Sequence, residues 1–267
     1  MDRYKQQKIS SEIRIPLFKN EESDHDYACR FIDETTDFLK KYALQVGKKG
    51  FVCNLSGGVD SFVTSMLIKK AGLFLINLSL PFSDKKDMGD VLLAKEVVKP
   101  DVFKVYDITK TVDDCLELLK ELPDSKVSIG NTKARVRMTI LYRVAEVYDI
   151  LVAGSINAAE LTLGMVTKYG DSAADVHPIA GATKRIVYEM AKIFEAPSSI
   201  IDKVSTAGLW DNGSNQEDVT ELNHQVCLYL RGKSISEEYE NRVVKLYENS
   251  RHKRHLSVRK QDAWWKK

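Results

Sequence analysis

Short apolar runs alternate along the chain with stretches in which apolar residues recur every three or four positions. The apolar runs predict strands covered on both faces, and the periodic stretches predict helices with one buried side. Strands that alternate with helices are typical of a parallel sheet sandwiched between helices. The hydrophobic pattern therefore predicts a doubly wound α/β fold with a parallel sheet and helices on both faces.

The individual elements follow from this pattern. Strands are expected at 51–56, 73–80, 102–108 and 150–155, and helices from Val59 to a stop at Gly72, around 87–98, around 111–122, over 131–148 and over 184–194. Two polar, aperiodic stretches, 166–177 and 205–219, are expected to be loops, and a ligand could order the second. We expect one domain over 1–267, with a flexible N-terminal extension at 1–23, helices in the last fifty residues and a basic C-terminal tail at 250–267.

Composition narrows the class of protein. The 267 residues carry 40 basic and 38 acidic side chains, and a net charge of +2 argues against a broad nucleic-acid surface. The apolar runs are far shorter than the ~20 residues that span a bilayer, and no signal-like segment opens the chain. Four scattered cysteines indicate neither a zinc site nor a disulfide framework. We expect a cytoplasmic protein without membrane or nucleic-acid partners.

The segment SGGVDS lies between the first predicted strand and the helix after it. Glycines at a helix N-terminus leave backbone N–H groups accessible, and these groups favour an anion such as a phosphate. The segment lacks the lysine of GxxxxGK[ST] and does not match GxGxxG, so neither common nucleotide motif applies. A tight turn without a ligand is the alternative for a glycine pair alone.

Two carboxylates occupy equivalent places after two predicted strands. Asp60 lies in the first helical turn after 51–56, and Glu160 lies in the first turn after 150–155. If the strands are parallel neighbours, both acids lie at the carboxyl edge of the sheet, where they could share Mg²⁺. Alternatively, each acid simply favours its own helix N-terminus, which stabilises by about 0.3–1 kcal/mol.

The SGGVDS segment resembles the pyrophosphate loop of the ATP pyrophosphatases. The blocks GNTKARVRM, AGSINAAELTLGMVTKYGDSAAD, TKR, STAGLW and HKR then follow in the order found in ammonia-dependent NAD synthetases, and this resemblance spans roughly Asp24 to the C-terminus. It implies a Rossmann-like fold of the adenine nucleotide alpha hydrolase kind and ATP-dependent amidation of deamido-NAD. An adenylated intermediate would form, and NAD, AMP and pyrophosphate would be released. Mg²⁺, ammonia as the nitrogen donor, no glutamine amidohydrolase domain and a homodimer with shared active sites are implied as well.

The resemblance also assigns roles to individual residues. ATP would be bound by Ser56, Gly57, Gly58, Val59, Asp60, Ser61, Ser155, Lys184 and Thr206, and Mg²⁺ by Asp60 and Glu160. Deamido-NAD would be bound by Arg135, Lys168, Asp175, His252 and Lys253. Asp171 would receive ammonium and take its proton, and Lys184 would spread the charge of the departing pyrophosphate.

Some positions depart from the family, and other interpretations remain open. Ser155 stands where threonine is usual, and Gly208, Val219 and Asn223 differ in or near the loop expected to close over the substrates. The arginines of 131–148 could be a solvated helix face, and the tail could be an ordinary basic terminus. Other adenylating enzymes, such as tRNA-thiolating or amide-forming ones, and a nucleotide-binding module without turnover are the alternative functions.

Overall fold

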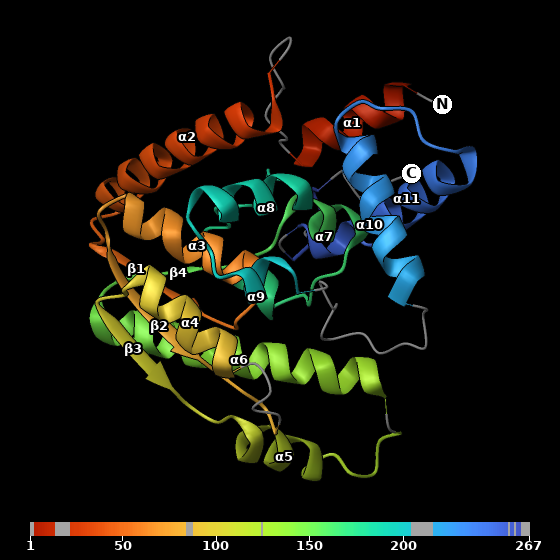
Figure 1. Cartoon of the computed structure of the whole chain (residues 1–267). Helices are drawn as coiled ribbons and strands as arrows, with labels where there is room; N and C mark the ends of the chain where they lie inside the picture. Colours follow the sequence, from red (N-terminus) through yellow and green to blue (C-terminus); the bar gives the residue numbers. More distant parts are fainter. Residues whose placement is uncertain are drawn as a thin grey trace.

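The structure is a computed structural model that describes residues 3–13, 22–83, 88–123, 125–203, 216–255, 257–258 and 260–262. Its centre is a four-stranded parallel sheet with the order β3-β2-β1-β4 (Figure 1). The strands are β1 (Gly50–Asn54), β2 (Phe74–Ser79), β3 (Val102–Val105) and β4 (Leu151–Ala153). The predicted doubly wound parallel sheet is confirmed, and each predicted strand exists within one to three residues of its expected ends.

Helices lie before the sheet, between its strands and after its last strand. They are α1 (Arg3–Ile13), α2 (Asp24–Gln45), α3 (Val59–Lys70), α4 (Met88–Val98), α5 (Thr109–Glu117), α6 (Lys126–Tyr148), α7 (Ala158–Leu163), α8 (Lys184–Ile193), α9 (Ser198–Ile201), α10 (Gln216–Leu230) and α11 (Glu237–Asn249). The helix predicted from Val59 ends at Lys70, and Gly72 follows with a φ of +70°. Helix α6 begins five residues before the predicted Asn131, because Ser125 caps it by accepting from the Ser128 N–H.

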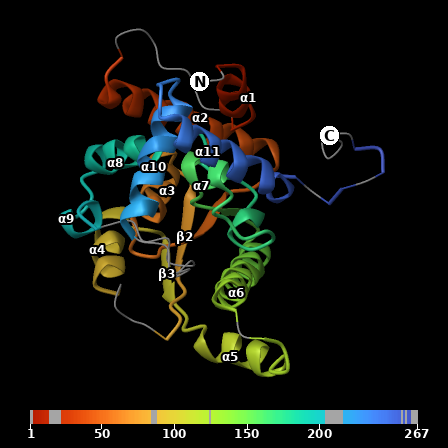
Figure 2. The ribbon, with the colours of Figure 1, turned by 90° about the vertical axis from the view of Figure 1, so that its right-hand side faces the viewer.

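Two layers of helices enclose the sheet. Figure 2 views the sheet almost edge-on, with α3, α4 and α8 on one side and α6 on the other. The first side contains the larger core, which includes Phe51, Phe62 and Leu67 and extends to Tyr27 and Leu39 of α2. The second side packs α5 and α6 onto the strands through a smaller core. Burial of both faces explains why β1 and β2 are almost continuously apolar.

A third cluster of helices lies beside the sheet and corrects one expectation. Helices α1, α7, α10 and α11 share a core to which α1 contributes Ile9 and Ile13, spaced to lie on one helical face. The side chain of Gln6 donates to the backbone oxygens of Tyr229 and Lys233 at the end of α10. The expectation of a flexible extension is therefore wrong for residues 3–13, because this short amphipathic pattern finds a partner surface 220 residues away.

The two predicted loops differ from expectation in part. The stretch 166–177 is irregular, as predicted, but it contains a 3₁₀ turn at Asp171–Ala173. Helix α10 begins at Gln216, so the last residues of the predicted loop 205–219 are helical, while 204–215 lie outside the described residues. Only parts of the tail 250–267 are described, and they include a 3₁₀ turn at Arg251–Lys253.

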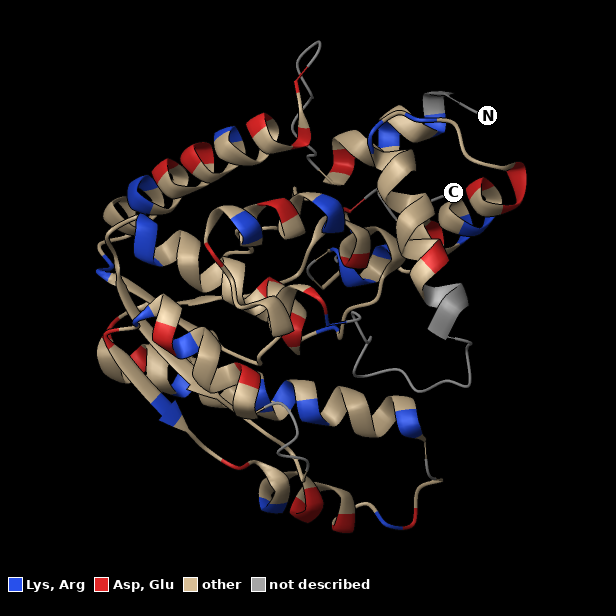
Figure 3. Ribbon diagram, in the orientation of Figure 1, with Lys and Arg blue, Asp and Glu red and all other residues tan. Residues whose placement is uncertain are grey.

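Charged residues of both signs are mixed on the surface, as Figure 3 shows along α2. This mixture agrees with the small net charge. None of the helices in the described part of the chain is both long enough and apolar enough to cross a membrane.

Candidate active site

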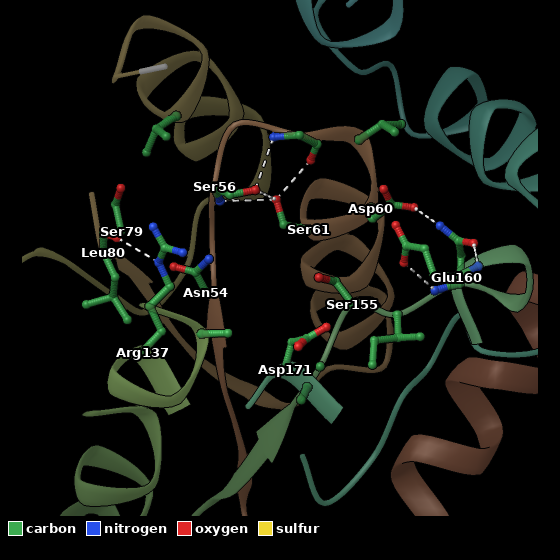
Figure 4. Close-up of a pocket in the computed structure, with 18 of the residues that line it drawn as sticks. Asn54, Ser56, Asp60, Ser61, Ser79, Leu80, Arg137, Ser155, Glu160 and Asp171 are labelled. Carbon is green, nitrogen blue, oxygen red and sulfur yellow. Dashed lines mark hydrogen bonds between the residues drawn. The ribbon is translucent and has the colours of Figure 1, made fainter. Parts of the chain in front are cut away.

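A cavity of about 520 Å³ opens at the carboxyl ends of β1, β2 and β4. Ligands of open parallel α/β sheets bind at this edge, at the point where the chain changes its direction across the sheet. Here that point is beside β1, because β2 and β3 lie on one side of β1 and β4 lies on the other. Predicted site residues that line the cavity are Ser56, Gly58, Val59, Asp60, Ser61, Ser155, Glu160, Asp171 and Lys184. Residues that are far apart in the sequence thus surround one space, as Figure 4 shows for several of them.

The glycine segment forms a tight turn from β1 into α3. Gly57 has a φ of +80°, which a residue with a side chain adopts only with strain, and Gly58 precedes the helix without a side-chain cap. The first backbone hydrogen bond of the helix runs from the Phe62 N–H to the Gly58 oxygen at 3.1 Å. The N–H groups of the first helical turn therefore have no backbone acceptor within the helix.

Two serine hydroxyls brace this turn. The Ser56 N–H donates to the Ser61 Oγ at 3.1 Å, and the Ser61 hydroxyl donates to the Gly58 oxygen at 2.9 Å. The two hydroxyl oxygens are themselves 3.1 Å apart. These bonds hold the turn open toward the cavity, so that the helix N-terminus presents its positive end to a ligand.

Asp60 is held from two sides. Its Oδ1 accepts from the Asn157 side-chain amide at 3.1 Å, and its Oδ2 forms an ion pair with the Lys184 ammonium. Lys184 is the first residue of α8, and both side chains are mostly buried. Burial disfavours the Lys184 charge, but Asp60 and Glu160 outweigh it, so the pKa of Lys184 lies above its usual value. The ammonium is therefore held in its charged form next to the glycine segment.

Glu160 belongs to a capping box at the start of α7. The Asn157 Oδ1 accepts from the N–H groups of Ala159 and Glu160, and the Glu160 carboxylate accepts from the Asn157 N–H. Burial raises the pKa of Glu160, and the Asp60 charge raises it further. Both acids line one cavity, so a negative charge on Asp60 disfavours a second negative charge on Glu160.

Asp171 lies on the 3₁₀ turn of the stretch 166–177. Its Oδ1 accepts from the Thr167 N–H at 2.7 Å, and its pKa is raised because burial outweighs this hydrogen bond. The Lys253 ammonium donates to the backbone oxygens of Gly164 and Val166, just before this turn. Lys253 thus stabilises the segment that carries Asp171, although Lys253 itself does not line the cavity.

Other predicted substrate residues gather outside the cavity lining. The Arg135 Nε donates to the Lys168 backbone oxygen at 3.3 Å. Burial lowers the pKa of the His252 imidazole, and the nearby charge of Lys168 lowers it further. Arg135, Lys168 and Lys253 therefore form a cationic group beside the cavity, and the His252 imidazole lies next to Lys168. The sequence places these residues on three separate segments, and only the fold brings them together.

Three further predicted residues have distinct settings. Asp175 is exposed, and its carboxylate accepts from the Val152 N–H at 2.7 Å and from the Tyr142 hydroxyl at 3.2 Å. Ser155 follows Gly154, where a Cβ would come within 2.4 Å of the His177 ring, so only glycine fits this approach. Thr206 lies outside the described residues.

Sequence reasoning missed several polar residues of the cavity. Asn157, Arg137 and Asn54 line it, and Asn223, noted as a departure from the family, lines it from α10. The capping pattern of Asn157 with Glu160 three residues later is a signal that could have identified Asn157. Arg137 is two residues from Arg135 on the same helix, and helical spacing alone does not tell which of the two faces a cavity.

The fold and the cavity define an α/β enzyme with an uncapped helix N-terminus beside an acidic pair. A family model described as NAD synthase matches residues 31–257. The NH(3)-dependent NAD(+) synthetase of Bacillus pumilus (strain SAFR-032) is 35% identical over 277 residues, with 98% of this chain and 99% of the relative covered.

Solved structures agree with this assignment. NMN synthetase from Francisella tularensis superimposes with a TM-score of 0.81 and 30% identity, covering 88% of this chain and 99% of that one. NAD+ synthetase from Burkholderia Pseudomallei gives a TM-score of 0.76 and 27% identity over 96% and 97% of the two chains. The chain belongs to the NAD synthase family and is a carbon–nitrogen ligase.

Proposed function

We propose that this ligase amidates deamido-NAD with ammonia, using ATP through an adenylated intermediate and releasing NAD, AMP and pyrophosphate. The observation that carries the proposal is the shared cavity. It combines the uncapped N-terminus of α3, the Asp60–Lys184 ion pair, Glu160 and the buried Asp171. An anion site, charge compensation and a base are the groups that adenylation followed by aminolysis requires.

The first half-reaction uses the glycine segment. The N–H groups at the start of α3 would bind phosphate oxygens of ATP, while the acceptor carboxylate attacks the α-phosphorus and pyrophosphate leaves. Lys184, charged and adjacent to the segment, would offset the charge that develops on the leaving group. Carboxylate activation in this way converts a poor leaving group into AMP, a good one.

Asp60 and Glu160 fit a divalent cation. Burial and then the Asp60 charge raise the pKa of Glu160, so the charged form of Glu160 is disfavoured, and a cation between the two acids would stabilise it. Within the described residues no third His, Cys, Asp or Glu completes a metal cluster, so phosphate and water oxygens would fill the remaining positions. Bound Mg²⁺ would offset the charge of the phosphates.

The second half-reaction uses Asp171. Ammonium has no free electron pair, so it must lose a proton before its nitrogen attacks the adenylated carbonyl carbon. Asp171 lines the cavity, and burial makes its carboxylate a stronger base than an exposed aspartate. Attack by ammonia on the carbonyl carbon then forms the amide. AMP leaves with the electrons of the bond between that carbon and the phosphate oxygen.

The rest of deamido-NAD would extend over His252 and over the cationic group of Arg135, Lys168 and Lys253. These charges suit the pyrophosphate of a dinucleotide. We also propose a homodimer with shared active sites. The cationic group lies outside the cavity lining, so the surface of a second copy of the chain could complete the pocket around it. The reaction would take place in the cytoplasm.

A mononucleotide acceptor is the second candidate, because the relative with a TM-score of 0.81 is an NMN synthetase. The chemistry at the carboxylate would be the same, but the cationic group would have only one phosphate to bind. The two candidates therefore differ in how much of the acceptor is recognised outside the cavity.

The test is turnover by the purified protein with ATP, Mg²⁺ and ammonium, with either deamido-NAD or nicotinate mononucleotide as acceptor. Mass spectrometry detects the amide product of each acceptor, and a coupled assay detects pyrophosphate. We expect NAD and pyrophosphate only when deamido-NAD is present. Preferential amidation of the mononucleotide would reject the first candidate, and no amide from either acceptor would reject both.

A further inference from the structure

Arg137 extends from α6 into the cavity on the side away from Asp60 and Glu160. Figure 4 shows its side chain directed toward Leu80, Ser79 and Asn54, at the ends of β2 and β1. The neighbouring Arg135 is exposed and instead contacts the backbone of Lys168. Two arginines on one helix thus have different surroundings, and Arg137 is the one that faces the nucleotide cavity.

Among the residues that the structure describes, the guanidinium of Arg137 is positioned by one hydrogen bond and has no ion-pair partner. Its Nε donates to the Leu80 backbone oxygen at 3.0 Å, which fixes the plane of the group. In the described ranges, which omit 84–87, no carboxylate forms an ion pair with it, and burial lowers its pKa. A mostly buried cation without a counter-charge is unfavourable, so the free protein stores a preference for an anion at this point.

One charged neighbour strengthens this preference. Lys133, one turn earlier on α6, is held over the Phe82 ring, and burial together with the Arg137 charge lowers its pKa. Two cations therefore lie close enough to repel each other. Asn54 has a buried side-chain oxygen that finds no hydrogen-bond partner among the described residues. This oxygen accepts, so it would bind a donor group of the ligand, such as a hydroxyl, and not the anion itself.

We propose that the terminal nitrogens of Arg137 bind an anionic oxygen group of a substrate, either a phosphate of ATP or the carboxylate of the acceptor. This inference rests on the proposed function and adds a binding residue to it. The bond from Nε to Leu80 leaves the Nη1 and Nη2 edge of the guanidinium for the ligand, a geometry that suits two oxygens of one carboxylate or phosphate. Arg137 therefore both binds and orients the anion relative to the glycine segment.

The test compares Arg137→Met and Arg137→Lys with Arg143→Gln, a matched control on the exposed side of the same helix. Isothermal titration measures the Kd of ATP with Mg²⁺ and, separately, the Kd of deamido-NAD. We expect at least one Kd to rise about 10- to 100-fold in Arg137→Met, as for a lost bond to a charged group. Arg137→Lys should be intermediate, because it keeps the charge without the planar fork, and Arg143→Gln should match the wild type.

The two sources of the anion give different results. If Arg137 binds a phosphate of ATP, the affinity for ATP falls. If it binds the carboxylate, the affinity for deamido-NAD falls while that for NAD, which carries an amide there, does not. Wild-type turnover, measured in the same preparation, reports on the proposed function independently of these comparisons.

Thermal melting separates a binding role from a structural one. We expect ligand-free Arg137→Met to melt at or above the wild-type temperature, since an uncompensated cation is removed, and to lose most of the ligand-induced rise in Tm. A lower Tm with an unchanged ligand-induced rise, or unchanged Kd values for both substrates, would overturn the proposal. If Arg137→Met does not fold, Arg137→Lys decides: wild-type affinities for both substrates in that folded variant would likewise overturn it.

Discussion

At the scale of single residues, burial determines which carboxylates could act as bases. Asp171 and Glu160 are both partly buried and have raised pKa values, whereas Asp175 is exposed and bonded to the β4 backbone. Of the two partly buried acids, only Asp171 is bonded to the loop rather than to the helix that starts after β4. These three carboxylates therefore have three different settings, and Asp171 is the one suited to accepting a proton.

The raised pKa of Asp171 makes a prediction about stability and pH. A carboxyl whose pKa is higher in the folded protein than the ~3.9 of the unfolded chain destabilises the fold once pH exceeds both values. We expect Asp171→Asn, which keeps an oxygen for the Thr167 N–H, to melt above the wild type at pH 8 and to lose this advantage as the pH falls toward 4. Differential scanning fluorimetry across this range is the measurement.

The same variant has a catalytic readout. Adenylate formation should persist in Asp171→Asn, while amide formation slows because the proton acceptor is lost. An equal melting temperature to wild type at pH 8 would contradict the burial argument, and loss of adenylate in the folded, Mg²⁺-loaded variant would contradict the assignment to ammonium.

At the scale of elements, the start of α7 links two parts of the site. Asn157 caps this short helix through its side-chain oxygen, and its amide nitrogen donates to Asp60 at the start of α3. The capping box therefore connects the crossover after β4 with the crossover after β1. Asn157 therefore orients both acids: its side chain orients Asp60, and its backbone N–H orients Glu160.

Asn157→Ala should therefore affect both stability and the site. We expect a loss of about 1 kcal/mol in the free energy of unfolding, the usual effect of removing an N-cap, together with weaker Mg²⁺-dependent ATP binding because Asp60 loses a partner. Urea denaturation and titration calorimetry measure the two effects. Asn157→Ser is the control, because serine keeps a capping oxygen but lacks the amide: it should recover stability and not binding. Recovery of both would show that Asn157 acts through the cap alone.

At the scale of the whole molecule, three exposed leucines lie together near the end of α5. Leu118, Leu119 and Leu122, at the end of α5 and just beyond it, are 79%, 54% and 57% exposed. Leucines this exposed and this close together are typical of surfaces that bind another protein. A second copy of the chain is the partner we expect, in keeping with the proposed homodimer.

We expect Leu118→Glu combined with Leu122→Glu to convert the dimer into monomers and to lower turnover, because charges at a buried contact oppose association. Light scattering coupled to size-exclusion chromatography measures the mass. Leu44→Glu is the control, since Leu44 is 82% exposed on α2, on the other side of the sheet. A dimer in both variants would place the interface elsewhere, and a monomeric wild type would reject the homodimer.

Local pattern was sufficient for much of the fold. Each expected strand depends on a short apolar run, and each expected helix depends on apolar residues every three or four positions and on stops such as Gly72. These signals act between residues that are close along the chain. The order of the sequence blocks likewise identified the family, now shown along most of the chain. Sequence also gave the glycine turn, because Gly57 needs a backbone conformation that other residues avoid.

Contacts between distant segments decided what pattern could not. Asp60 meets Lys184 and Asn157 only because β1 and β4 are neighbours, and α1 is a packed helix only because α10 covers its apolar face. Periodicity assigns Arg135 and Arg137 to one helix, whereas the packing of α6 on the sheet sends only Arg137 into the cavity. Sequence by itself determined the elements, the glycine turn and the family, since these depend on neighbours along the chain. Tertiary structure alone decided which charges share the cavity, because burial and charge pairing depend on distances in space that residue order does not specify.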